Sequence, residues 1–125
     1  MNVERRRKRS SYSGLALRYW LTSVASQQRL FALVLADAAG LLVASSLGGP
    51  EAEELAAVAP LLARPDEAGI NVAERSDVPV VIHKLLFDQS SFFLCAVGDR
   101  KRSRQSVRVA EGGVRRILDE PTVAA

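Results

Sequence analysis

The segment FALVLADAAGLLVASS, residues 31–46, constrains the fold of this chain more than any other stretch. It could form a membrane-spanning segment, a buried helix, or two strands folded back on each other. Asp37 lies inside the apolar run, and a carboxylate at the centre of a bilayer is unfavourable by about 3 kcal/mol. A continuous helix would bury the same carboxylate and would place Gly40 in its interior, where glycine weakens a helix. We therefore expect no transmembrane segment.

The sequence Asp37-Ala38-Ala39-Gly40 is typical of a β-turn. Aspartate at the first position accepts a hydrogen bond from the amide two residues later, and glycine at the fourth tolerates the positive φ needed to rejoin a strand. Apolar runs of strand length flank the turn at residues 31–36 and 41–45. The segment therefore predicts a β-hairpin.

One helix is expected before this hairpin and another after it. Leu17, Trp20, Leu21 and Val24 recur at the spacing of an amphipathic helix over residues 15–28. A second helix is predicted from Pro50, because proline suits a first helical position and three glutamates follow where the helix dipole favours anions. Pro60 is expected to kink or break this helix, with a short second segment reaching residue 63 or 64.

The second half of the chain predicts another hairpin and a last helix. A possible short strand at 70–73 precedes apolar runs at 80–86 and 92–97, which flank Asp88-Gln89-Ser90. The run 92–97 is apolar on both faces and is therefore expected at the centre of the sheet. The last helix is predicted from the spacing of Val107, Ala110, Val114, Ile117 and Leu118.

The ends of that last helix carry their own signals. Ser103 or Ser106 is the expected N-terminal cap, and Pro121 is expected to close the helix. The pair Gly112-Gly113 lies inside it, which suggests a close approach of the helix to the sheet, or a bend.

These elements predict one α/β (α+β) domain in the order helix, two strands, helix, two or three strands, helix. A chain of 125 residues holds one core of ordinary size. We expect a basic, disordered arm at 1–13, the folded domain at 14–120 and a short tail at 121–125.

The net charge of +3 hides an uneven distribution. Residues 1–9 have a net charge of +4 and residues 100–108 a net charge of +5, whereas residues 30–99 hold three basic and ten acidic residues. The two basic clusters are candidates for binding an anionic surface or an acidic partner. Their members are Arg5, Arg6, Arg7, Lys8, Arg9, Arg100, Lys101, Arg102 and Arg104.

No catalytic or cofactor motif is present in the sequence, so we expect a protein that is not an enzyme and holds no cofactor and no metal. His83 is the only histidine and has no partner motif to activate. SSLGG before Pro50 resembles a phosphate-binding loop, but the following glutamates would repel an anion, so it is interpreted as a strand-to-helix connection. The single Cys95 lies in an apolar run and indicates a buried side chain and a reducing, cytoplasmic location.

Residues 31–62, FALVLADAAGLLVASSLGGPEAEELAAVAPLL, resemble the roadblock / dynein light chain family, bacterial type. The matching positions are Asp37, Gly40, Leu41, Val43, Ala44 and Ser45. The resemblance implies a roadblock/profilin-like domain, with an antiparallel sheet of about five strands and helices on both faces. It also implies a dimer with itself or a similar roadblock domain, formed through the second helix and an edge strand.

Such domains are non-enzymatic platforms for Ras-like small GTPases or for motor and polarity complexes. The dimer-interface candidates are four apolar residues of the second helix, Leu55, Val58, Ala59 and Leu62. Two alternatives remain open: a module that binds anionic lipid or nucleic acid through the basic arm, and a small-molecule sensor domain.

Overall fold

The computed structural model describes residues 3–63, 70–75 and 78–119, with side chains for residues 13–63 and 78–119. The predicted α+β class and element order are confirmed. Along the chain the elements are α1 (Val3–Gln28), β1 (Ala32–Asp37), β2 (Leu42–Ser45), α2 (Pro50–Leu62), β3 (Ile70–Arg75), β4 (Val78–Phe87), β5 (Ser90–Val97) and α3 (Arg100–Asp119). The predicted tail and the stop at Pro121 lie outside the described residues.

The strands form one five-stranded sheet in the order β2-β1-β5-β4-β3, and every neighbouring pair is antiparallel. Strand β5 is central, as its apolar run predicts. Leu33 and Leu94 point to one face of the sheet, whereas Val34 and Cys95 point to the other. Because helices cover both faces, β1 and β5 have to be apolar on both sides.

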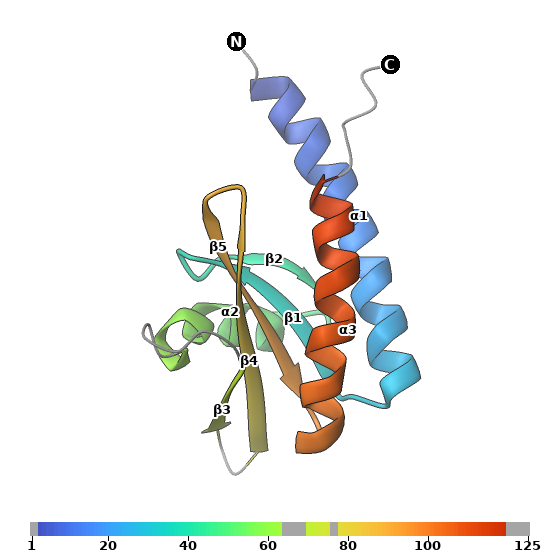
Figure 1. Ribbon diagram of the computed structural model, residues 1–125. Helices are drawn as coiled ribbons and strands as arrows, with labels where there is room; N and C mark the ends of the chain where they lie inside the picture. The colour runs from blue at the N-terminus through green and yellow to red at the C-terminus, as the bar shows by residue number, and fades with distance from the viewer. Residues whose placement is uncertain (1–2, 64–69, 76–77, 120–125) are drawn as a thin grey trace.

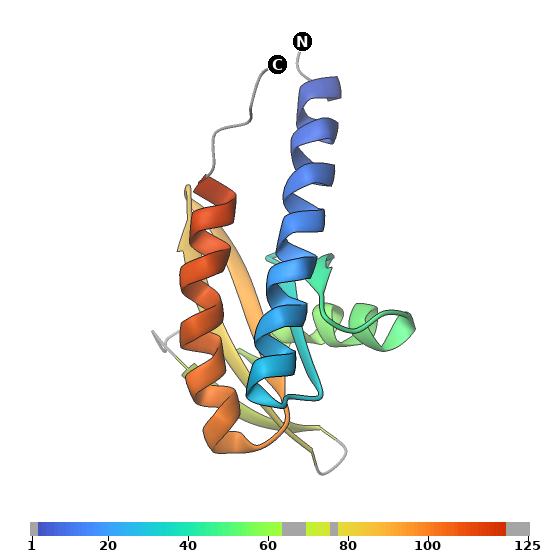
Figure 2. The same ribbon diagram turned by 90° about the vertical axis from the view of Figure 1, so that its right-hand side faces the viewer.

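The helices form layers on the two sides of the sheet. Helices α1 and α3 lie side by side and antiparallel on one face, and α2 crosses the other face (Figures 1 and 2). The predicted apolar stripes of α1 and α3 both point inward. Their fully buried members are Leu17, Leu21 and Val24 in α1 and Val107, Ala110 and Val114 in α3.

Both hairpins form through the expected turn residues. The Asp37 carboxylate accepts hydrogen bonds from the amides of Ala39 and Leu41, each at 2.9 Å, and Gly40 has a φ of 80°. In the second hairpin Asp88 and Gln89 have φ values of 51° and 66°, so both central residues are left-handed, as in a type I′ turn.

The basic segment at the N-terminus differs from the prediction. We expected residues 1–13 to be a disordered arm, but the backbone is helical from Val3, so α1 continues through this segment. Arginine, lysine and glutamate are good helix formers. Extending a helix already fixed by its packed stripe also needs no new nucleation.

Of the kink or break expected at Pro60, the structure shows no break. The helix runs from Pro50 to Leu62, and the Ala63 amide still bonds the Ala59 carbonyl at 3.0 Å. Proline lies in the last turn and removes a single backbone bond there. The neighbouring Ala59 is fully buried on the sheet, and this packing outweighs the loss.

The predicted N-terminal cap of α3 is also wrong. Asp99 takes this role, because its carboxylate accepts a hydrogen bond from the Arg102 amide at 3.0 Å. Ser103 and Ser106 lie inside the helix and are buried, and the Ser106 hydroxyl donates to the Arg102 carbonyl at 2.6 Å.

Of the two glycines in α3, Gly113 serves a close contact with α1. A Cβ on Gly113 would lie 2.1 Å from Cε2 of Trp20, whereas nothing lies within 4 Å of a Cβ on Gly112. The Trp20 indole N–H donates to the Ala110 carbonyl at 2.9 Å, and the Arg116 guanidinium lies 5.8 Å from the ring centroid. Gly113 therefore lets the indole lie directly against the backbone of α3.

This contact gives a matched pair of substitutions. Gly113→Ala should lower the free energy of unfolding by about 2 kcal/mol, because the indole must move and its hydrogen bond weakens. Gly112→Ala should raise it by about 0.5–1 kcal/mol through helix propensity alone. Urea unfolding followed by the fluorescence of the single tryptophan measures both. Equal effects at the two positions would contradict the close contact.

Candidate interaction surfaces

The connection between β2 and α2 fixes where α2 begins. The Ser45 hydroxyl accepts a hydrogen bond from the Leu47 amide, and the Ser46 hydroxyl accepts one from the Leu33 amide, both at 2.9 Å. Gly49 has a φ of 85° and directly precedes Pro50. These hydroxyls are engaged in the strand-to-helix connection that the sequence predicts.

Helix α2 packs closely on the sheet because its inner face carries mostly small side chains. Ala52, Ala56 and Ala59 are buried there together with Leu55. The β1–β2 turn meets the helix as well, since a Cβ on Gly40 would lie 3.2 Å from the Ala57 carbonyl oxygen. The glycine is therefore needed for close approach as well as for its positive φ.

The four dimer-interface candidates do not share one environment. Leu55 and Ala59 are buried in the core of their own chain, so their side chains point away from solvent. Val58 and Leu62 are half-buried and pack against the same core. The sheet of the same chain therefore covers much of the apolar stripe of α2 that the family resemblance implies for a partner.

The outer face of α2 presents a residue that sequence reasoning missed. Leu61 is 81% exposed, and Ala57 is exposed beside it on the helix surface. The signal was present in the spacing: Ala52, Ala56 and Ala59 define an inner face, and Leu61 falls opposite it. An exposed leucine is ordinary by itself, but this one lies on the helix that the family resemblance assigns to dimerisation.

The sheet has two edges, β2 and β3. Within the described part of the chain, β3 pairs only with β4 and β2 pairs only with β1. An edge strand presents unpaired backbone donors and acceptors, to which another strand can be added.

The two basic clusters lie at opposite ends of the α1/α3 layer. Because the helices are antiparallel, the N-terminus of α1 lies at the far end from the N-terminus of α3 (Figure 2). Residues 5–9 are on the helical backbone of α1. Arg100, Lys101, Arg102 and Arg104 are all exposed at the start of α3. The fold does not bring the two clusters together.

His83 takes part in an ionic cluster that joins β4 to α3. Its Nε2 lies 2.6 Å from a carboxylate oxygen of Glu111, whose other oxygen accepts a bond from Arg115 Nε at 2.7 Å. Arg115 also donates to the Leu86 carbonyl at 2.8 Å. Burial alone would raise the pKa of Glu111, but the hydrogen bonds and positive charge of Arg115 and His83 hold it below its ordinary value.

Cys95 is fully buried between the sheet and α2, and burial raises the pKa of its thiol to about 12. Such a thiol is protonated and unreactive at neutral pH. Among the described residues, no group of His, Cys, Asp and Glu side chains is placed to hold a metal ion. Within the same residues, no helix combines the length and the apolar character needed to cross a bilayer.

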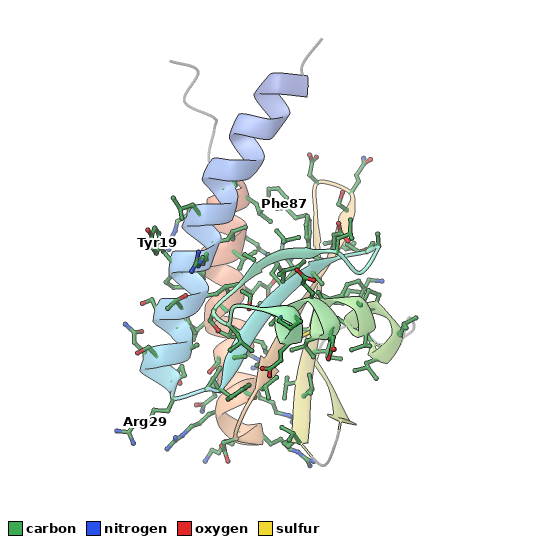
Figure 3. All side chains as sticks on the ribbon, turned by 180° about the vertical axis from the view of Figure 1, so that it is seen from behind. Tyr19, Arg29 and Phe87 are labelled. Carbon is green, nitrogen blue, oxygen red and sulfur yellow. The ribbon has the colours of Figure 1, made fainter. Side chains whose placement is uncertain are left out.

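A half-open hollow of about 450 Å³ lies at one end of the α1/α3 layer. Leu17, Val43, Phe87 and Phe92 form much of its wall, with Ser13, Asp88 and Ser90 at its polar positions. Phe87 lies at the end of β4 that faces this hollow (Figure 3). This is the site where the small-molecule sensor hypothesis would place a ligand.

Comparisons with known proteins match the fold but not the sequence. No protein-family model matches the chain, and no curated protein is similar to it in sequence. MglB from Myxococcus xanthus is 14% identical with a TM-score of 0.59, over 86% of this chain and 93% of that one. The gliding protein MglB from Thermus thermophilus is 15% identical with a TM-score of 0.63, over 87% of this chain and 93% of that one.

A third structure, described as MglB with a tetrameric arrangement, is 13% identical with a TM-score of 0.61, over 85% of this chain and 90% of that one. The matches cover most of this chain and at least 90% of each matched chain, so this chain has the roadblock fold that residues 31–62 predict.

The Glu111 cluster predicts a pH dependence of stability. Because the folded pKa of Glu111 is lowered, its stabilising contribution is present above the ordinary value of 4.5 and is lost as the pH falls through the folded pKa. Glu111→Gln should therefore be less stable than wild type at pH 7, and the difference should vanish in acid. Urea unfolding across this pH range measures it, and a difference that grows in acid would contradict the sign.

Proposed function

We propose that this chain is a non-enzymatic, dimeric scaffold or regulatory module that binds a Ras-like small GTPase or a related signalling or polarity complex. The observation that supports it is the roadblock fold, shared over 85–87% of the chain with three MglB structures. The family resemblance assigns such domains to GTPase and polarity complexes. A role without catalysis is supported by the burial of Cys95, whose thiol stays protonated at neutral pH.

The proposed dimer uses the outer face of α2 and an edge strand of the sheet, as the family resemblance implies. Leu61 is 81% exposed and would be covered by a second copy of the chain. Removing each Leu61 side chain from water stabilises the dimer by about 1.5 kcal/mol. Ala57, also exposed, allows the two helices to approach closely. The description of one similar structure as a tetrameric arrangement supports self-association of this fold.

The charges on α2 favour an antiparallel arrangement of the two helices. Glu51 and Glu53 lie in the first turn of α2, and the helix carries no basic residue. In a parallel pair the glutamates of both copies would meet and repel each other. In an antiparallel pair about a twofold axis, they lie at opposite ends of the interface, with Ala57 near its middle.

The dimer is tested by Leu61→Glu. A twofold interface contains the residue twice, so the substitution should weaken dimerisation by about 100-fold and leave a folded monomer. Leu15→Glu on α1 replaces another exposed leucine on the opposite side of the molecule and should have no effect. Light scattering behind size exclusion measures the mass, and a wild-type monomer at high concentration would exclude the proposed dimer.

GTPase binding is tested with purified Ras-like GTPases encoded in the same genome, loaded with GDP or with a non-hydrolysable GTP analogue. We expect a stable complex in one nucleotide state, seen by co-elution and by calorimetry. The rate of GTP hydrolysis with and without this chain then separates stimulation from anchoring. Absence of a complex with every such GTPase in both nucleotide states would contradict the proposal.

A further inference from the structure

The charges of this protein are segregated onto the two faces of the sheet. Helix α2 carries three acidic residues and no basic one, whereas α3 carries seven basic and two acidic residues on the opposite face. One of the two acids of α3, Glu111, is already paired with Arg115 and His83. The α1/α3 layer is therefore strongly basic, and the α2 layer is acidic.

The basic residues of α3 line up on its solvent face. Lys101, Arg104 and Arg108 follow one another at spacings of three and four, so they lie along one ridge of the helix. All three are exposed, and within the described residues none of them forms an ion pair. Like charges at this spacing repel, and those at the helix start also oppose the dipole, so the ridge does not serve the fold.

Exposed apolar side chains accompany these charges in the same layer. Tyr19 and Leu15, one turn apart on α1, are 67% and 49% exposed, and Val109 on α3 is 50% exposed. Tyr19 projects from α1 away from the rest of the molecule, and Arg29 projects from the end of the same helix (Figure 3). A surface that combines basic side chains with exposed aromatic and aliphatic side chains is typical of proteins that bind the membrane interface.

We propose that the outer surface of the α1/α3 layer docks onto an anionic phospholipid bilayer. The two helices lie side by side and give a broad surface (Figure 2), and the exposed cations Lys101, Arg104 and Arg108 run along the first half of α3. A bilayer presents phosphate groups over a similarly broad plane, with an interface that accepts tyrosine and leucine. Nucleic acid fits less well, because no row of aromatic side chains offers stacking platforms beside the ridge.

The proposal does not depend on the function proposed above, because it uses the opposite face of the sheet. Docking through α1 and α3 turns the acidic α2 layer away from the negatively charged bilayer (Figures 1 and 2). The outer face of α2 and Leu61 then remain accessible to a protein partner. Vesicle binding and dimerisation therefore test separate proposals, and either proposal can be contradicted while the other holds.

The test is sedimentation of the full chain with vesicles of phosphatidylcholine containing 30% phosphatidylserine. Each basic side chain near such a surface strengthens binding roughly fivefold, so Arg104→Gln with Arg108→Gln should weaken partitioning by about 25-fold. Glu51→Gln with Glu53→Gln on α2 is the matched control and should not weaken it. Tyr19→Ser should weaken binding several-fold at a salt concentration where the charge contribution is screened.

Four results would overturn the proposal: no sedimentation of the wild type, equal sedimentation with pure phosphatidylcholine, an unchanged affinity of the Arg104→Gln, Arg108→Gln variant, or tighter binding to a DNA duplex than to the vesicles. Circular dichroism of each variant establishes that the exposed substitutions leave the fold intact. A loss confined to the α3 variant, together with a steep salt dependence, supports the bilayer.

Discussion

The contact between Trp20 and Gly113 fixes how the two long helices lie on each other, and the α1/α3 layer depends on it. The indole ring occupies the space that a side chain at Gly113 would fill, and its N–H donates to the Ala110 carbonyl at 2.9 Å. A direct hydrogen bond to a helix backbone leaves little freedom in the distance between α1 and α3. Leu17 and Leu21 are then held over the sheet beside Val107, so the packing of one face follows from this contact.

The opposite face is organised by small residues instead of a large one. Ala52, Ala56 and Ala59 let α2 lie close to β1 and β5, and Gly40 lets the β1–β2 turn reach the backbone of the helix. The small side chains of α2 and the absence of a side chain at Gly40 bring the backbones of α2, the sheet and the β1–β2 turn closer together. The closer packing stabilises the fold through dispersion contacts and burial of apolar surface. Leu55 is buried in the core of its own chain, so the proposed partner surface is limited to the outer face of α2, where Leu61 is exposed.

The sequence predicted the features that depend on neighbouring residues and missed those that depend on tertiary contacts. The Asp37–Gly40 turn and the inward stripes of α1 and α3 follow from local geometry, and the structure confirms them. The cap at Asp99 was missed because Ser103 and Ser106 are equally good caps in isolation. The continuity of α2 through Pro60 depends on burial of Ala59, and the role of Gly113 depends on a residue 93 positions earlier in the chain. The exposure of Leu61 follows from its position opposite Ala52, Ala56 and Ala59, but an alanine face is a weaker sequence signal for burial than the larger Leu55 and Leu62 side chains.

The acidic helix α2 and the basic α1/α3 layer lie on opposite faces of the sheet, so the two sides of the domain are suited to different kinds of partner. Helix α2 carries Glu51 and Glu53 in its first turn and the exposed Leu61. Two copies of this helix can pack together only in an orientation that keeps the glutamates of the two chains apart. The basic α1/α3 layer does not need a partner in one defined position. A negatively charged bilayer attracts its basic side chains equally well wherever the protein lies on the membrane surface. Specific recognition is therefore expected on α2 and the sheet edges, whereas α1 and α3 are suited to localisation. Since the sheet separates the two layers, the surface proposed for a protein partner and the surface proposed for a bilayer do not overlap.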